Sequence, residues 1–482
     1  MIKNLVKDSV VYGGADFFSK ALAFVTFPII AAVLTPLAFG TLELLMTTIA
    51  LLGLFMNCGV NNAVQRFYWD KDTLELERPV VVTSGFLVLL VLGFFCLIIG
   101  FAIIPYLMPY IEKNNLPITG VALVSSLALL LLSQWLGYLL DVTRLHFAPW
   151  RFFSLSLTSR VLGLALGVVA VVWLGWGVDG LLAVQASAAF IVLPFAIWTV
   201  RKDITFRIDF EWIKSLTQYG YPYIFAGMAY WIFGSIDRWM LASMSSVEEV
   251  GIYSVAFRFA SVVLLFSTAF GQAWSPYAIK IRTDQPLLYR QTYARVLLLL
   301  LFCMLVSGGG VALFSGEIIG LIMPLNYGGS ALPLALLCFG IILQSTQQVT
   351  AIGISIEKKT FLFSRIAWVS AGVNFILNYL LIPRYGGIGA AWATSLSYLV
   401  LTSYYLFYTQ RLHPLPIQWR KLGLLLILGT CILVFSVMKV SLTISWSLVL
   451  AKIVIALICA SVAWRVLKIK GFRGLVIMPF RH

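Results

Sequence analysis

Residues 79–104, PVVVTSGFLVLLVLGFFCLIIGFAII, run without a charged side chain and follow directly on Arg78. About 20 apolar residues in a helix cross the hydrocarbon core of a bilayer, so we predict a membrane-spanning helix here. The same pattern recurs along the whole chain. It predicts fourteen spans, at residues 10–34, 39–62, 79–104, 117–141, 151–175, 178–200, 215–243, 250–277, 291–313, 328–353, 360–381, 387–409, 419–437 and 446–467.

The composition agrees with a polytopic membrane protein. The chain has 482 residues, of which 61% are hydrophobic and 11% are charged. A soluble protein cannot bury that much apolar surface in one core. The links between spans are at most roughly 18 residues long, which leaves no room for a soluble domain. The sequence also lacks the P-loop pattern G-x-x-x-x-G-K-[ST], so ATP hydrolysis by that route is excluded.

The cations alternate between the two sides of the predicted membrane. With Met1 inside, the outer links carry Lys113, Arg384 and Lys439, whereas the inner links and tails carry most of the others. This distribution follows the positive-inside rule. It predicts a multi-pass protein of the plasma (inner) membrane with both termini cytoplasmic. The net charge of +15 then indicates contact with anionic lipid, not with nucleic acid.

Two glycine motifs recur at nearly the same offset. Gly40-Thr41-Leu42 opens the second span and Gly251-Ile252-Tyr253 the eighth, 211 residues later; residues 177–180 and 387–390 also match, at an offset of 210. The repeat predicts an all-α membrane protein of two six-helix lobes, related as a parallel repeat around a central cavity. The lobes are residues 1–205 and 206–412. Residues 413–482 add two transmembrane helices and a basic cytoplasmic tail.

Charged residues inside the spans are candidates for function, because each costs about 2.5–3.5 kcal/mol at a helix centre. Asp16 and Lys20 share a face of the first helix. They either neutralise one another during insertion or lie on the cavity wall, where Lys20 meets an anionic head group. Asp237 and Arg258 lie at similar depth, as a structural ion pair or as part of the cavity.

Three further charged residues belong to the same set. Arg238 is expected to line the cavity or to extend toward the outer interface. Glu43 lies on the second helix. Arg160, on the fifth, is close enough to the cytoplasmic side to extend to that interface. The sequence leaves these alternatives open.

Amide side chains form stripes at helical spacing. Gln344, Gln347 and Gln348 follow i, i+3, i+4 spacing on the tenth helix, and Asn374 and Asn378 are four residues apart on the eleventh. Amides facing lipid would have no hydrogen-bonding partner, so these faces are expected to point into the protein. Helix–helix hydrogen bonding and a sugar-lined path are both compatible with them.

The sequence offers no catalytic or metal-binding constellation. All six cysteines lie in apolar stretches without C-x-x-C spacing, and His146, His413 and His482 lie outside the spans. No Ser/His/Asp set can be assembled. We therefore expect no enzyme activity, no metal and no cofactor, and we leave coupling to protons or sodium ions open.

Three motifs together resemble a known family. They are the stretch from Gly59 to Arg66-Phe67-Tyr68, Asp237-Arg238 followed by residues 251–256 (GIYSVA), and residues 386–394 (GGIGAAWAT). The chain is similar to polysaccharide flippases of the O-antigen type, within the multidrug/oligosaccharidyl-lipid/polysaccharide exporter superfamily. Ser19-Lys20 resembles a Ser-Arg step of the related lipid II flippases. Here Lys replaces Arg, which removes a bidentate phosphate clamp at this position.

The resemblance implies a flippase for a polyprenyl-pyrophosphate-linked oligosaccharide, moved from the cytoplasmic to the outer leaflet for surface polysaccharide synthesis. Its partners would be that lipid-linked glycan, membrane lipid, a glycan polymerase and glycosyltransferases. The expected substrate-binding residues are Lys20, Arg160, Arg238, Arg258, Gln344, Gln348, Asn374 and Asn378, and the expected ion-coupling or charge-pairing residues are Asp16, Glu43 and Asp237.

Two other functions remain as alternatives. An ion-coupled multidrug exporter of the same superfamily would need a carboxylate-rich pocket, whereas cations match or outnumber acids in these spans. An integral-membrane glycan polymerase or ligase tends to need a long outer loop. The longest outer links here, near residues 105–116 and 314–327, are short.

Overall fold

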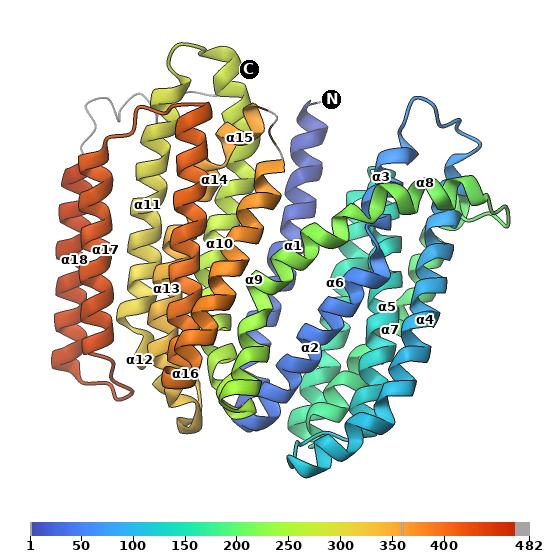
Figure 1. Ribbon diagram of the computed structural model, residues 1–482, viewed down its shortest axis with the longest axis horizontal. Helices are drawn as coiled ribbons and strands as arrows, with labels where there is room; N and C mark the ends of the chain where they lie inside the picture. Colours follow the sequence, from blue (N-terminus) through green and yellow to red (C-terminus); the bar gives the residue numbers. More distant parts are fainter. Residues whose placement is uncertain (1, 358, 360, 468–482) are drawn as a thin grey trace. The chain divides into compact units, whose positions relative to one another are not determined.

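The computed structural model describes residues 2–357, 359 and 361–467, and the regular elements within these ranges are helical. The chain divides into two compact units, Met1–Gly251 and Ile252–His482. Figure 1 traces the helices of each unit in chain order. The lobe boundary predicted from the repeat, at residues 205/206, stays a prediction.

The first unit begins at the N-terminus and runs into the start of a long helix that continues into the second unit. Its elements, with η1 a π-helix and η2 a 3₁₀ turn, are α1 (Ile2–Val33), α2 (Pro36–Asn57), α3 (Val60–Tyr68), α4 (Arg78–Lys113), α5 (Gly120–Leu145), α6 (Pro149–Val168), η1 (Val169–Trp173), α7 (Gly177–Thr199), η2 (Arg201–Asp203), α8 (Phe210–Gly220), α9 (Pro222–Met244) and α10 (Val247–Asp284).

The second unit contains most of α10 and the helices that follow it. These are α11 (Tyr289–Leu313), α12 (Ser315–Ile322), η3 (Leu325–Ser330), α13 (Ala331–Ser345), α14 (Gln347–Thr350), α15 (Ile352–Ile356), α16 (Phe361–Leu412), α17 (Trp419–Met438) and α18 (Trp446–Leu467).

Among the described residues, eleven helices are long and apolar enough to cross a membrane. The prediction of an all-α, multi-pass membrane protein is thus confirmed. Helix α16 counts once but breaks at Gly386 (φ 52°, ψ −132°), where the sequence predicts a link between two spans. Helices α1 and α9 are not among the eleven. The count of fourteen therefore stays a prediction.

Local sequence sets where α2 begins and ends. Thr35 caps its start, because the Thr35 hydroxyl accepts a hydrogen bond from the Ala38 amide at 3.2 Å. The helix ends where Cys58 (φ 47°) and Gly59 (φ 68°) adopt the left-handed conformation. A Cβ at Gly59 would collide with the backbone of Gly220, so this glycine allows α3 and α8 to pack closely.

The apolar core of the first unit is formed by side chains of α3, α4, α5, α7 and α8. Its largest buried member, Tyr138, donates a hydrogen bond from its hydroxyl to the Val82 carbonyl oxygen at 2.6 Å. Helices α5 and α7 pack along one another, as do α6 and α7 (Figure 1). Through Val192 and Ala196 this core holds the C-terminal part of α7, which precedes the η2 turn with its cations Arg201 and Lys202.

In the second unit a ladder of hydroxyl groups joins α16 to α13 and α14. Ser395 donates to the Leu336 carbonyl oxygen at 2.6 Å, and Thr402 donates to that of Leu343 at 3.1 Å. Thr409 donates to that of Thr350. Donors and acceptors both advance by seven residues, so the two helices run parallel with a coiled-coil-like register.

A buried ion pair attaches the last helix to the rest of the second unit. The Lys452 ammonium on α18 donates to both carboxylate oxygens of Glu317 on α12, at 2.6 and 2.7 Å, and Lys452 is 0% exposed. A Cβ at Gly316 or Gly320 would collide with the backbone of residues 441–442, so these glycines seat the loop that precedes α18. Helices α17 and α18 also pack on α11 (Figure 1).

Candidate functional site

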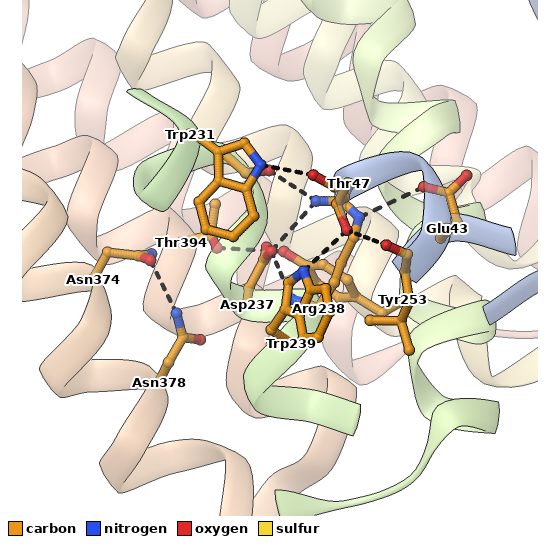
Figure 2. A network of polar contacts seen from close by, with 12 residues as sticks. Glu43, Thr47, Trp231, Asp237, Arg238, Trp239, Tyr253, Asn374, Asn378 and Thr394 are labelled. Carbon is orange, nitrogen blue, oxygen red and sulfur yellow. Dashed lines mark hydrogen bonds and ion pairs between the residues drawn. The ribbon is translucent and has the colours of Figure 1, made fainter. Parts of the chain in front are cut away.

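Three charged side chains of the first unit form a buried cluster where α2 packs on α9. The Arg238 guanidinium lies 3.7 Å from the Glu43 carboxylate and 3.3 Å from that of Asp237. It also donates to the Gly234 carbonyl oxygen at 2.8 Å. Figure 2 shows Glu43 and Asp237 on opposite sides of the guanidinium. The exposed fractions are 7% for Glu43, 2% for Asp237 and 5% for Arg238.

Two tryptophans fix the register of α9 against α2 beside this cluster. The Trp239 indole N–H donates to the Thr47 hydroxyl at 3.1 Å, and that of Trp231 donates to the Thr47 carbonyl oxygen at 2.9 Å (Figure 2). Thr47 lies one helical turn after Glu43, so the hydrogen bonds and the ion pair lie on one face of α2. The indole groups therefore hold the Glu43 carboxylate opposite Arg238.

The geometry of the cluster favours some sequence predictions over others. Glu43 and Asp237 are paired with a cation, in keeping with the charge-pairing role. The Arg238 guanidinium is buried beside two carboxylates of its own unit, and its place in the cavity or toward the outer interface stays a prediction. Its burial also disfavours direct contact with a substrate in this conformation. The predicted pair of Asp237 with Arg258 joins residues of different units and stays a prediction.

A close backbone contact lies one turn before the cluster. A Cβ at Gly40 would collide with the Val247 carbonyl oxygen, and one at Gly251 would collide with that of Pro36. Glycine permits such an approach because it has no side chain. Gly40 and Gly251 are also the two glycines that occupy equivalent places in the sequence repeat. The repeat motif therefore marks a helix crossing as well as a helix start.

Arg160 on α6 lines a recess of about 240 Å³ within the first unit. Polar groups from three helices share it: Ser133 of α5, Ser156 and Ser159 of α6, and Gln185 of α7. Of the described residues that line it, none is acidic. The recess lies within the candidate span Pro149–Trp173. It combines one cation with hydroxyl and amide groups, which suits an anionic or hydroxyl-rich ligand.

The other predicted cations lie on different helices. Lys20 is exposed on α1, which packs along α6, the helix of Arg160, within the first unit. Arg258 is half-buried on α10 in the second unit. Asp16 lies in α1, but its side chain is outside the described residues.

The glutamines of the second unit lie near the end of α13 and in α14. Leu325–Ile356 is one candidate span, in agreement with the expected tenth helix, and Thr346 and Ala351, which separate α13, α14 and α15, keep right-handed helical dihedral angles. The side-chain oxygen of Gln344 is buried and has no hydrogen-bond partner among the described residues. A Cβ at Gly271 would collide with the Gln348 amide, so this side chain packs directly on the backbone of α10.

The two asparagines form a buried amide pair. The Asn378 amide nitrogen donates to the Asn374 side-chain oxygen at 3.0 Å, and both residues are 0% exposed (Figure 2). The pairing uses one donor and one acceptor. The side-chain nitrogen of Asn374 and the side-chain oxygen of Asn378 have no hydrogen-bond partner among the described residues. Buried polar groups of this kind are normally matched by water or by a ligand.

Two ionic groups escape the sequence analysis. Lys452 is the single charged residue of an apolar run before Arg465 and lies within a predicted span, so its charge marks it as a special position. Its partner Glu317 lies in a predicted outer link, where a charged residue is ordinary. Asn61 donates to the Asp141 carboxylate at 2.7 Å, and Asp141 also pairs with Arg144 at 3.1 Å. Spacing along α5 is enough to suggest the Asp141–Arg144 pair, but the partners in the Lys452–Glu317 and Asn61–Asp141 contacts are far apart in the sequence, and spacing does not reveal them.

The sequence has relatives among proteins named as probable flippases. The sequence is 21% identical over 429 residues to the probable low-salt glycan biosynthesis flippase Agl15 of Haloferax volcanii, covering 87% of this chain and 86% of that protein. It is 24% identical to the probable flippase AglR of the same organism, covering 70% of each chain. These named relatives are flippases rather than enzymes, in agreement with the expected function class.

The fold also resembles a solved flippase structure. The inward closed conformation of the lipid II flippase MurJ superposes with a TM-score of 0.74 at 14% identity, covering 97% of this chain and 100% of that one. At that identity the likeness concerns the fold alone. Residues 5–282 match the family described as polysaccharide biosynthesis protein. Because this match extends over more than half of the sequence, the chain belongs to the polysaccharide biosynthesis protein family.

Proposed function

We propose that this protein is a flippase that moves a polyprenyl-pyrophosphate-linked oligosaccharide from the cytoplasmic to the outer leaflet by alternating access. The family, the two flippase relatives and the flippase-like fold support a flippase-type function in glycan biosynthesis. The identity of the cargo and the transport cycle are the further steps of this proposal.

The observation that carries the proposal is the Arg160 recess. A glycan head group has many hydroxyls, and removing each from water without a new hydrogen bond costs about 1–3 kcal/mol. Serine and glutamine side chains inside an apolar span lower that cost, and the Arg160 guanidinium attracts a pyrophosphate. The lipid tail needs no protein cavity, because it stays in the bilayer during transfer.

The exposed cation of α1 supports the same function. Lys20 is accessible, and its helix lies along α6. An ammonium and a guanidinium on neighbouring helices suit the two phosphates of a pyrophosphate better than either cation alone. Arg258 is a third candidate on the second unit.

Location and partners complete the proposal. The positive-inside distribution supports insertion in the plasma membrane with both termini cytoplasmic. A flippase at this point receives its cargo from glycosyltransferases on the inner side and delivers it to a polymerase on the outer side.

The direct test is transport in proteoliposomes. Purified protein is reconstituted with a fluorescent polyprenyl-pyrophosphate-linked oligosaccharide, and transfer is measured as protection from, or access to, an added glycosidase. We expect Arg160→Gln to slow transfer at least about tenfold, Arg160→Lys to retain part of the rate, and the exposed control Arg207→Gln to match the wild type.

Imposed proton and sodium gradients in the same vesicles identify the coupling ion. Wild-type vesicles that never move the labelled glycan, with either gradient and in either direction, would contradict the proposal. Extrusion of organic cations by these vesicles without glycan transfer would favour the multidrug exporter instead.

A further inference from the structure

A second basic pocket lies in the first unit, apart from the Arg160 recess. It is a depression of about 560 Å³ at the ends of two helices that pack along one another. Arg151 and Ser154 come from the first turns of α6, and Trp198 comes from the last turn of α7. Arg201 and Lys202 of the η2 turn complete it.

The charge of this pocket is strongly one-sided. Of the described residues that line it, Arg151, Arg201 and Lys202 are cations and none is acidic. The Arg201 guanidinium lies 4.7 Å from the centre of the Trp198 ring, which holds it beside the depression by a cation–π contact. Three cations gathered in one concave site attract a group with more than one negative charge.

The carboxylate nearest in sequence is directed away from the pocket. Asp203 ends the same 3₁₀ turn but is 5% exposed, and it accepts hydrogen bonds from the Tyr68 hydroxyl at 3.2 Å and from His146 Nε2 at 2.7 Å. Those two contacts anchor the turn to the interior of the unit. Consequently Arg201 and Lys202 lie at the surface, while the neighbouring carboxylate of Asp203 contacts Tyr68 and His146 in the interior.

The position of the pocket identifies the class of ligand. It lies at the ends of the candidate spans Pro149–Trp173 and Gly177–Thr199, and the ends of membrane-spanning helices reach the level of the lipid head groups. Leu155 and Phe195 add apolar surface to its lining, and Phe195 is 63% exposed. A ligand that suits both surfaces has a phosphate head and an apolar tail.

We infer that this α6–α7 pocket binds the phosphate head group of an anionic phospholipid from the surrounding membrane. Basic pockets between transmembrane helices on the cytoplasmic side are suited to such lipids. The acyl chains lie along Leu155 and Phe195, and the phosphate lies between Arg151 and the η2 cations. The inference does not depend on the transport function, since it concerns a lipid bound at the edge of one unit.

The test is lipid binding to the full-length protein in detergent, measured by native mass spectrometry during titration with phosphatidylglycerol or with phosphatidylcholine. Each cation near a membrane surface contributes about fivefold to binding of anionic lipid, so loss of three corresponds to about a hundredfold. We expect the triple variant Arg151→Gln, Arg201→Gln, Lys202→Gln to bind phosphatidylglycerol about a hundredfold more weakly, with phosphatidylcholine binding unchanged.

A matched variant separates the pocket from overall charge. Arg207 and Lys214 are exposed cations that do not line it. The double variant Arg207→Gln, Lys214→Gln is expected to bind phosphatidylglycerol as the wild type does. Equal loss of lipid in both variants would overturn the inference, as would wild-type binding by the triple variant.

Two competitors separate the possible sources of the phosphate. Inorganic pyrophosphate is expected to displace bound phosphatidylglycerol poorly, because it offers nothing to the apolar surface. Displacement at equal concentration would assign the pocket to a soluble anion. Polyprenyl pyrophosphate that outcompetes phosphatidylglycerol in the wild type but not in the triple variant would assign it to the flippase cargo. Either result would overturn the phospholipid assignment.

Discussion

At the scale of single residues, Arg238 links α2 to α9 by neutralising two buried carboxylates. Its guanidinium contacts Glu43 and Asp237 and also a backbone carbonyl group. Burying ions is costly unless each has partners, so removing one partner costs more than the pair itself contributes. The stability of this part of the unit therefore depends on the charge of one side chain.

Replacing that cation should destabilise the protein. We expect Arg238→Gln to lower the free energy of unfolding by about 3–5 kcal/mol, because two carboxylates lose the guanidinium between them. Arg238→Lys should lose less stability than Arg238→Gln. The exposed control Arg207→Gln should change the free energy of unfolding by less than about 0.5 kcal/mol. Thermal unfolding in detergent measures the difference. Equal melting temperatures for all four proteins would show that the cluster is not required for stability.

Tyr68 supports a prediction about pH. It lies outside the candidate spans, and burial followed by the nearby Asp203 carboxylate raises its pKa to about 12. Between pH 10 and 12 the unfolded chain loses the phenolic proton while the folded chain keeps it, so the wild type loses stability as pH rises through that window. Below pH 10 this contribution is fully present.

The variant Tyr68→Phe removes this titration. We expect it to be less stable than the wild type at pH 8 by about 1.5–3 kcal/mol, since it loses a hydrogen bond to a carboxylate. The difference in free energy of unfolding between the wild type and Tyr68→Phe should become smaller as the pH rises from 10 to 12. A constant difference across that range would mean that the phenol does not titrate as the structure implies.

The sequence identifies the residues of the buried cluster but not their partners. A charge in an apolar span is visible from composition, so Glu43, Asp237 and Arg238 are predictable as special positions. The contact between Glu43 and Arg238 depends on the packing of α2 on α9, and their separation along the chain gives no sign of it. For the same reason the recess around Arg160 was not predicted, since three helices build it.

At the scale of helices, apolar runs locate the elements, and a glycine marks the interruption inside one of them. The break at Gly386 follows from a glycine-rich link in the sequence. Thr346 and Ala351 keep helical dihedral angles, and hydroxyl bonds from α16 lie alongside this stretch, among them Thr409 to Thr350. Such tertiary hydrogen bonds cannot be read from local helix propensity.

The glycine crossing of α2 and α10 can be tested by adding one methyl group. Gly40→Ala places a Cβ against the Val247 carbonyl oxygen, and we expect a loss of about 1–3 kcal/mol in stability. Gly372→Ala is the control, because a Cβ there meets nothing within 4 Å on α16. In thermal unfolding, the melting temperature of the control should equal or exceed that of the wild type. If the two variants melt at the same temperature, the close approach at Gly40 is not real.

The ion pair between α12 and α18 should behave as a coupled unit. We expect Lys452→Gln to cost about 3–5 kcal/mol, because the Glu317 carboxylate then stays buried without its cation. The double variant Lys452→Gln, Glu317→Gln should cost clearly less than the sum of the single changes. Chemical or thermal unfolding of the four proteins completes this cycle, and additive losses would argue against a direct interaction.

At the scale of the whole molecule, the family match and the flippase relatives support the predicted class of protein. Composition and charge alternation are sufficient for the membrane fold, because the bilayer imposes both. The sequence repeat predicts only where matching helices begin in the two lobes. The residue range of each lobe remains a prediction.

The proposed transport function assigns the glycan path to exposed or half-buried cations of both units, Lys20 and Arg258. We expect Lys20→Ala or Arg258→Ala to abolish surface glycan in cells while the amount of protein in the membrane stays unchanged. Surface glycan is measured by lectin or antibody labelling and protein by immunoblotting of membranes. The control Lys214→Ala should keep full labelling. Full export by both variants would exclude these two side chains from the path of the glycan.

The pairing of Lys452 with Glu317 has a consequence for biogenesis. Glu317 is synthesised 135 residues before Lys452, which neutralises it. Helix α12 therefore has no partner for this carboxylate until α18, the last helix of the described chain, has been made. Until α18 leaves the translocon, the Glu317 carboxylate of the nascent protein lacks the Lys452 ammonium. Insertion of α18 by itself into lipid would cost about 2.5–3.5 kcal/mol for its lysine. A chain truncated before residue 446 should therefore be less stable in the membrane, because Glu317 stays buried without Lys452.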